Sequence, residues 1–332
     1  DGGPPDRGSP PPIALAGSGR QRGRIHGESL RETIHEAVDR WRRELANELG
    51  SPVDEYLAAL VGETSFERAI SRWTPDLLDE VEGIAEGAGI DRATMVAFQL
   101  VDEDWWFRRN RRLGLSSTWG RCSVLAIAGD GSASPVVAQN LDIPKWSDCL
   151  QVILRPRWPD RADDLVFTYA GLIGLTGIGG AGVAVCVNSL IQLDTRIDGL
   201  PVAFLVRKLL GSAGLENAVR FLTDVPHASG QSYVVAAPAG IAAFECSAAG
   251  ALPLARKDGD GCICHTNHPL LNRETRTFDE VCRCEDPAKL ERSRVNSERR
   301  LQCLRATVDE AGPREPPADI AVRALRSHGD DV

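Results

Sequence analysis

The chain has 332 residues, a net charge of −9 at pH 7 and 26% charged side chains. Phosphate backbones bind basic surfaces, so this acidic balance argues against nucleic acid as a partner. No run of about 18 apolar residues occurs, and no membrane span is expected. Nine cysteines in a chain of this length favour thiols in a reducing compartment over a disulfide framework, so we expect a cytoplasmic protein.

The first part of the chain predicts a leader followed by helices. Residues 1–22 are rich in proline and glycine, which predicts a disordered leader. Because the chain begins with Asp1 rather than Met, we expect a trimmed fragment. Residues 24–108 are predicted to be mainly helical, with Thr74 and Asp91 as N-caps. The first helix has one apolar face, formed by Leu30, Ile34, Val38, Trp41, Leu45 and Leu49.

The pattern changes to strands near residue 115. The segment "CSVLAIAGDGSASPVVAQNLDIP" has two apolar runs around a Gly/Asp/Ser turn, which predicts a hairpin. Strands are also expected in "CLQVILRP", "DLVFTYAGLIGLTGIG" and "GVAVCVNSLIQ", and a second hairpin in "QSYVVAAPAGIAAFECSAA". Helices are expected over residues 201–223 and 285–310. This order indicates an α+β protein with mostly antiparallel strands.

A glycine-rich segment and a group of Cys and His residues are the first candidates for a bound group. Gly177–Gly182 fit the G-x-G-x-x-G pattern, but a strand-like "VAVCVNSL" follows instead of a helix, so we interpret the segment as a turn. Zinc would suit the thiols and imidazoles, yet the usual C-x2-C spacing is missing, and we expect no metal and no organic cofactor. The residues concerned are Cys262, Cys264, His265, His268, Cys282 and Cys284.

Cys122 allows three interpretations from its surroundings. It can be a core thiol, or a papain-like nucleophile served by His265 or His268 downstream. Papain-type thiols are activated at a helix N-terminus, whereas the residues after Cys122 are strand-like. The third interpretation is an N-terminal nucleophile, freed by chain cleavage, whose own α-amine acts as the base.

Five segments in order resemble the isopenicillin N acyltransferase family, which comprises autoproteolytic cysteine acyltransferases and amidases of the N-terminal nucleophile superfamily. They are "RGRIHGESLRETI", "LDEVEGIAEGAGID", "CSVLAI" with "VVAQNLDIP", "AGLIGLTGIGGAGVAVCVNSL" and "CHTNHPLL". Each segment alone is a weak signal, but their order and spacing agree from about residue 17 onward.

The resemblance implies a fold and a division of the chain. The expected fold is a four-layer αββα sandwich of the N-terminal nucleophile hydrolase type with mostly antiparallel sheets. Residues 23–332 would form one domain, divided by self-cleavage into a helical piece, 23–121, and a β-piece, 122–332, which stay associated. Past the stretch matching "SHGDDV" the family continues with further segments, so we expect the chain to be truncated at Val332.

The resemblance also implies roles for individual residues. Cys122 matches the nucleophile, and cleavage would break the Arg121–Cys122 bond. Asp142 matches the acid that orients the new amine, Asn267 the oxyanion donor, and Asn188 a second polar position near it. Arg121 stands where the family usually has glycine.

The activity implied is acyl transfer or amide hydrolysis through a Cys122 thioester, on a small-molecule acyl amide or with acyl-CoA as donor. Three other classes stay open at this stage: a papain-like cysteine protease, a zinc-binding interaction module, and a non-catalytic relative with an uncut chain.

Overall fold

The computed structural model describes residues 11–49, 52–111, 121–129, 134–254, 261–274, 287–312 and 315–327. Its first part is helical, as the sequence predicts, and Asp91 caps α6 by accepting a hydrogen bond from the Thr94 amide at 2.8 Å. Leu30 lies in a break between two helices rather than inside one. The helices are α1 (Gly19–Ser29), α2 (Arg31–Leu49), α3 (Val53–Gly62), α4 (Phe66–Trp73), α5 (Pro75–Ala88), α6 (Arg92–Phe98) and α7 (Val101–Asn110).

The prediction of a disordered leader up to residue 22 is wrong for residues 13–22. Ile13–Leu15 form β1, which pairs in parallel with β4 (Gln151–Pro156), and Leu15 is fully buried. Ser18 then caps α1 in a reciprocal arrangement with Gln21. Composition misled here because a short edge strand needs only a few apolar residues and a partner strand that the local sequence does not reveal. Residues 1–10 lie outside the described part of the chain.

Two of the five segments that resemble the family lie on α1 and α5, and their glycines allow these helices to pack closely. The two helices pack backbone against backbone, and a Cβ on Gly23 would come within 1.9 Å of the Glu80 carbonyl oxygen. A Cβ on Gly83 would come within 2.2 Å of the Arg20 carbonyl oxygen. Only glycine permits this separation, so the glycines of "RGRIHG" and "EGIAEGA" serve close helix packing.

The larger sheet has eight strands in the order β1-β4-β5-β6-β7-β8-β9-β10, antiparallel except for the β1–β4 pair. Its hairpin β8–β9 turns at Pro238 and Ala239, as predicted, and the Gly177–Gly182 segment ends β6 and turns toward β7 without a helix. The strands not yet given are β5 (Leu165–Tyr169), β6 (Thr176–Ile178), β7 (Ala184–Ser189), β8 (Gln231–Ala237), β9 (Gly240–Ser247) and β10 (Gly250–Pro253).

The smaller sheet holds the predicted nucleophile strand at its centre. β2 (Ser123–Ile127) lies between β3 (Val136–Asn140) and β11 (Cys262–His265), and both pairs are antiparallel. Ser123 pairs with Asn140 and Val124 pairs with His265. This register brings the start of β2, the end of β3 and the end of β11 together at the same end of the sheet.

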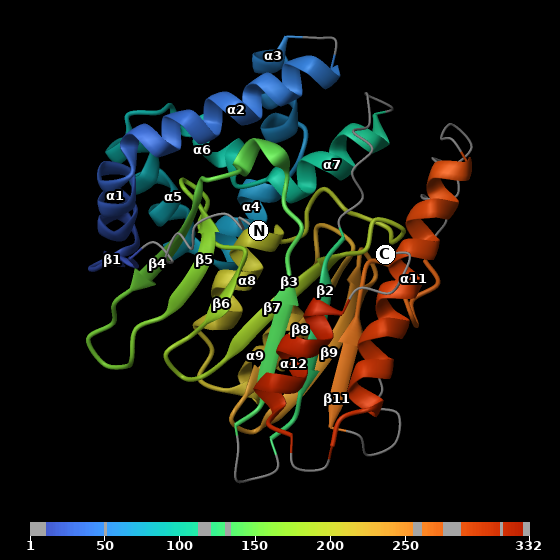
Figure 1. The fold of residues 1–332 in the computed structure, drawn as a ribbon. Coiled ribbons are helices and arrows are strands. Elements are labelled where there is room, and N and C mark those ends of the chain that lie inside the picture. The colour runs from blue at the N-terminus through green and yellow to red at the C-terminus, as the bar shows by residue number, and fades with distance from the viewer. Residues whose placement is uncertain are drawn as a thin grey trace, which may run out of the picture.

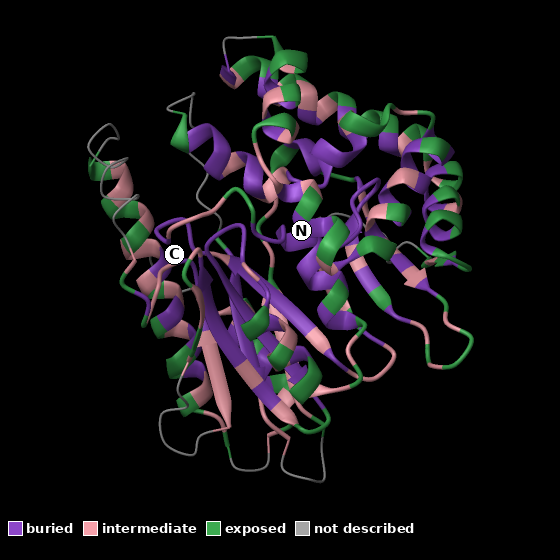
Figure 2. Cartoon of the chain, turned by 180° about the vertical axis from the view of Figure 1, so that it is seen from behind, coloured by how far each residue is buried: buried purple, intermediate pink, exposed green. Residues whose placement is uncertain are grey.

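Four layers follow from the packing of helices on the two sheets. α8 (Val202–Leu210) and α9 (Leu215–Asp224) pack on the larger sheet, whose β7 and β8 face the smaller sheet. α11 (Pro287–Asp309) and α12 (Pro317–Arg326) cover the other face of the smaller sheet (Figure 1). The predicted α+β, four-layer αββα architecture is therefore confirmed, and buried residues run along the strands between the layers (Figure 2).

The helices α1–α7 gather at one end of this sandwich and are joined to it by buried polar contacts (Figure 1). Glu80 of α5 accepts hydrogen bonds from Arg22 of α1 and Arg207 of α8, and all three side chains are at most 4% exposed. Glu103 of α7 accepts from the Val202 amide and the Ser229 hydroxyl, each at 3.0 Å. None of the described helices is long and apolar enough to cross a membrane.

Candidate active site

Cys122 lies directly before β2, and its side chain is buried, with 5% of its surface exposed. Its Sγ is 4.0 Å from the Asp142 carbonyl oxygen. Burial raises the pKa of the Cys122 thiol to about 11; the Asp142 charge also raises it, while the hydrogen bond at the Asp142 backbone and the positive charge of Arg300 oppose the shift. In the uncut chain the thiol is therefore protonated at neutral pH, and a base is needed before it can act as a nucleophile.

Asp142 reaches Cys122 because of the β2–β3 register. β3 ends at Asn140, opposite Ser123, and the chain continues past Cys122 through Leu141. The Asp142 side chain is exposed, so its carboxylate is at the surface of the site while its carbonyl faces the thiol.

Asn267 follows β11 and is held by four contacts. Its side-chain Nδ2 donates to the Ser189 carbonyl oxygen at 3.2 Å, and its Oδ1 accepts from Arg300 at 3.0 Å. Its backbone amide donates to Ser297 Oγ at 2.9 Å, and its carbonyl accepts from Gln192 at 3.1 Å. The side chain is 5% exposed. A primary amide has two N–H groups, and among the described residues Nδ2 makes the one bond to Ser189, which leaves the second N–H for another acceptor.

In the hydrogen bonds of the described residues, Asn188 of β7 contacts the loop that carries Asn267 and not the Cys122 thiol. Its Nδ2 donates to the carbonyl oxygens of His265 at 3.0 Å and Thr266 at 3.2 Å. Its Oδ1 accepts from Gln139 of β3 at 3.2 Å. Asn188 is fully buried, and its amide joins both sheets to the loop that carries Asn267.

Glu245 of β9 fixes the other side of the same loop. The carboxylate is fully buried and accepts from His265 Nε2 at 3.0 Å and from the backbone amides of Leu270, Leu271 and Asn272. Burial alone would raise the pKa of Glu245, but the hydrogen bonds from His265, Leu270 and Asn272 hold it below its ordinary value. A buried carboxylate with several donors organises the turn after "HTNH".

Arg300 of α11 is the site residue that the sequence analysis missed. Its Nη1 donates to the Cys122 carbonyl oxygen at 2.5 Å and to Ser123 Oγ at 2.9 Å, while Nη2 donates to Asn267 Oδ1. Burial lowers the pKa of Arg300 from its ordinary value. Buried Ser297, Leu301 and Leu304 mark the inner face of α11, and Arg300 falls on that face three residues after Ser297. An arginine on a buried helical face was the available signal.

The papain-like arrangement is not observed. His265 uses Nδ1 on the Thr266 carbonyl at 2.8 Å and Nε2 on Glu245, so both ring nitrogens are engaged away from Cys122. His268 Nδ1 contacts Ser297 Oγ at 2.8 Å. Among the described residues no group of three or more His, Cys, Asp or Glu side chains is arranged to hold a metal. Cys282 and Cys284 lie outside the described residues.

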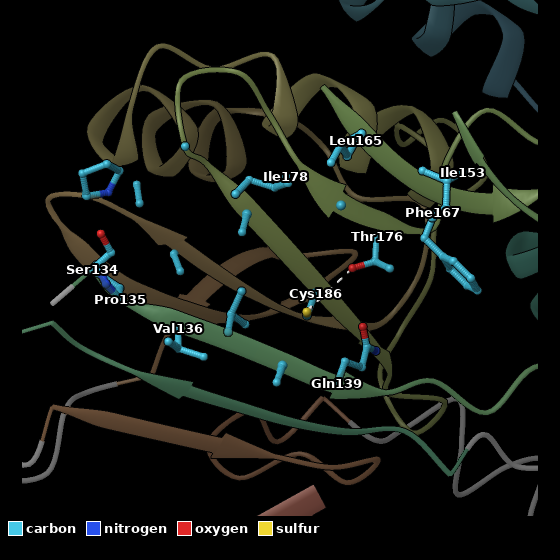
Figure 3. A pocket seen from close by; sticks show the side chains of 18 residues that line it. Ser134, Pro135, Val136, Gln139, Ile153, Leu165, Phe167, Thr176, Ile178 and Cys186 are labelled. Carbon is cyan, nitrogen blue, oxygen red and sulfur yellow. Dashed lines mark hydrogen bonds between the residues drawn. The ribbon is translucent and has the colours of Figure 1, made fainter. Parts of the chain in front are cut away.

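A separate apolar groove runs between β3 and the face of β5, β6 and β7 (Figure 3). Phe167, Thr176 and Ile178 line it from the larger sheet, and Gln139 of β3 and Cys186 of β7 are also among its lining residues. Cys122, Asp142, Asn188 and Asn267 are not among its lining residues. Gln139 connects the groove to the site by donating to Asn188 and to the Val187 carbonyl at 2.7 Å.

Comparison with known proteins decides the family. The family model of acyl-coenzyme A:6-aminopenicillanic acid acyl-transferase matches residues 136–302, half of the chain. The chain belongs to this family. A member from Emericella nidulans, the acyl-coenzyme A:6-aminopenicillanic-acid-acyltransferase 40 kDa form, is 25% identical over 263 residues, covering 78% of this chain and 70% of that protein. The predicted family is thus confirmed.

The acyl-transferase family match covers part of the candidate site. The matched segment contains Asp142, Asn188, Asn267 and Arg300 and starts after Cys122. Among solved structures, penicillin V acylase from Agrobacterium tumefaciens is similar at 14% identity with a TM-score of 0.32. That match spans 62% of each chain, less than two thirds of the acylase.

Proposed function

We propose that this protein is an autoproteolytic cysteine acyltransferase or amide hydrolase with Cys122 as its N-terminal nucleophile. One observation carries the proposal: Arg300 hydrogen-bonds both to the Cys122 carbonyl and to the Asn267 side chain. A buried thiol at the start of a central strand and an amide donor are thereby held in one network. Membership in the acyl-transferase family supports the same chemistry.

Maturation would be an attack of the Cys122 thiol on the Arg121 carbonyl carbon. The C–N bond breaks, a thioester forms, and the thiol proton goes to the released amine. Water then hydrolyses the thioester, which leaves a carboxylate on Arg121 and a free thiol and α-amine on Cys122. Arg121 is exposed and directly precedes Cys122, whose thiol is buried.

The mature site would use the α-amine as its base. A free α-amine has a pKa of about 8, so it takes the thiol proton and a thiolate attacks the substrate carbonyl. The second Asn267 N–H would stabilise the oxyanion, and the ammonium returns its proton to the leaving amine. Asp142 would orient the amine. Water completes hydrolysis of the thioester, or a second amine completes transfer.

The substrate we propose is a small-molecule acyl amide, and an acyl-CoA would form the same thioester with release of the CoA thiol. The two pieces of the cut chain would stay together, because buried bonds cross between them. Glu80 with Arg207, Gln99 with Gly171 and Ile173, and Glu103 with Val202 all join residues before Cys122 to residues after it.

The test is a denaturing gel with N-terminal sequencing of the purified protein. We expect two fragments, the larger beginning Cys-Ser-Val-Leu, and an uncut chain in Cys122→Ala. Cys186→Ala is the matched control, because Cys186 is also buried but contacts Thr176 instead of the site, and it should still be cut. An active wild-type protein with a single chain, or cleavage at the same bond in Cys122→Ala, would refute the proposal.

A further inference from the structure

Two thiols outside the candidate site lie next to each other on β11. Cys262 and Cys264 are two residues apart on one strand, so their side chains leave the same face. Their Sγ atoms are 3.9 Å apart and form a hydrogen bond. Both residues are only partly buried and pack against the cluster that includes Leu304 of α11 and Ala324 of α12.

The surroundings make Cys264 more acidic than an ordinary cysteine thiol. The hydrogen bond from Cys262 lowers the pKa of Cys264 below its ordinary value, and Arg305 of α11 adds to the effect. Burial and the charge of Asp309 act in the opposite direction but do not cancel it. The thiolate is the form that reacts with peroxides, so this pair combines a reactive thiol with a second thiol in contact with it.

We propose that Cys262 and Cys264 are a reversible oxidation site that a hydroperoxide converts into a disulfide. The Cys264 thiolate attacks the peroxide oxygen, the O–O bond breaks, and a sulfenic acid forms with release of water or an alcohol after protonation. The Cys262 sulfur then attacks the Cys264 sulfur, the S–O bond of the sulfenic acid breaks, and its hydroxyl leaves as water with the Cys262 thiol proton. Two thiols are oxidised by two electrons and one peroxide is reduced.

The disulfide would bend the strand that carries it. Residues i and i+2 of an extended strand are roughly 6.7 Å apart at Cα, at the upper end of the separation that disulfides span. Closing the bond therefore draws Cys262 and Cys264 together and displaces Ile263, which pairs with Ala126 of β2. β11 is an edge strand beside β2, at the side of α11 (Figure 1). The bend would therefore disrupt the hydrogen bonds between β11 and β2.

The bend would reach the candidate site through three residues of chain. β11 ends at His265, and Asn267 follows in the loop held by Ser297 and Arg300. A change in the direction of β11 moves the anchor of this loop. Oxidation of the pair would thus loosen the position of Asn267 without touching Cys122.

Peptide mapping tests the chemistry independently of any acyl transfer. The full chain carrying Cys122→Ala is treated with hydrogen peroxide, alkylated and cut with trypsin, which places Cys262 and Cys264 alone together in the peptide 258–273. We expect this peptide to lose two hydrogen atoms, to resist alkylation, and to recover both thiols with dithiothreitol. Two alkylated thiols after peroxide, or a disulfide from either residue to another cysteine, would overturn the proposal.

Two serine variants assign the steps, and exposed Cys149 is the control thiol. In Cys262→Ser a sulfenic acid on Cys264 should be trapped by dimedone, because its resolving thiol is gone. In Cys264→Ser oxidation of Cys262 should be several-fold slower; an equal rate would reject Cys264 as the attacked thiol. Hydrogen exchange should rise in β11 and β2 of the oxidised chain, and unchanged exchange would reject the predicted bend.

Discussion

Two buried networks that contain arginine differ in how the arginine charge is balanced. At the junction of the helices and the sandwich, Arg22 and Arg207 share the Glu80 carboxylate, and all three are almost fully buried. At the candidate site, Arg300 donates to the Cys122 carbonyl, Ser123 Oγ, Asn296 Oδ1 and Asn267 Oδ1. In the described part of the chain, none of these partners of Arg300 is a carboxylate.

The difference separates a structural network from one suited to chemistry. Burial alone would raise the pKa of Glu80, but Arg207 and Arg22 hold it below its ordinary value, so its negative charge is satisfied in place. Among the described residues, the hydrogen-bond acceptors of the Arg300 cation are neutral, and its charge lowers the pKa of the Cys122 thiol against the effect of burial. We therefore expect changes in the first network to alter stability, and changes in the second to alter catalysis.

The largest effect is expected from Glu80→Gln. It leaves two buried guanidinium groups without a carboxylate, and loss of one partner of a buried ion pair costs about 3–5 kcal/mol of the free energy of unfolding. Urea unfolding measures it. Glu82→Gln is the control, because Glu82 pairs with Arg20 and Arg92 near the surface and should cost at most about 1 kcal/mol. Equal losses in both variants would contradict the comparison.

Asn267→Ala tests the second network at its proposed oxyanion donor. Removing one such donor lowers kcat about 10²–10³-fold, so we expect a loss of this size on a panel of acyl p-nitroanilides. Asn272→Ala is the control: Asn272 lies in the same loop, its side-chain Oδ1 accepts from the Glu274 amide, and its backbone amide, which donates to Glu245, is kept in the variant. An Asn267→Ala enzyme with unchanged kcat would remove Asn267 from the mechanism.

Arg300→Gln should lower kcat about 10²-fold while the free energy of unfolding changes less than in Glu80→Gln. The reason is that Asn267 and the start of β2 lose their common donor and drift from the productive geometry. Arg300→Lys keeps the charge without the planar fork and should recover part of the activity. Arg294→Gln, an exposed arginine on the same helix paired with Glu291 and Glu298, should behave as wild type.

A pH dependence of stability is expected from His26. Burial lowers the pKa of His26 to about 4, and its Nε2 accepts from the Gly171 amide at 3.1 Å. The unfolded chain binds this proton near pH 6.5 and the folded chain does not, so stability is full above 6.5 and falls toward pH 4, by at most about 3 kcal/mol. His26→Gln should flatten that slope in urea unfolding; His227, whose pKa burial also lowers to about 4, keeps its own contribution. An unchanged slope would exclude His26 as the cause.

The sequence anticipated the parts of the fold that local patterns encode. The apolar face from Ile34 to Leu49, the Asp91 cap and the hairpins around Gly177 and Pro238 depend on neighbours a few residues away, and each is present. The leader was predicted too long because β1 depends on β4, well over a hundred residues distant.

For the candidate site, the sequence by itself indicated, through its resemblance to the family, the residues that we propose to carry the chemistry: Cys122, Asp142 and Asn267, with Asn188 as a further polar position. The tertiary structure alone decided how they are connected. The β2–β3 and β2–β11 registers bring Asp142 and Asn267 to the start of β2. Asn188 donates a hydrogen bond to the His265 carbonyl and so supports the loop that carries Asn267. Arg300 lies on a helix 178 residues after Cys122 and donates to the Cys122 carbonyl. A hydrogen bond over that separation depends on how α11 packs on the smaller sheet, and no local pattern in the sequence records that packing.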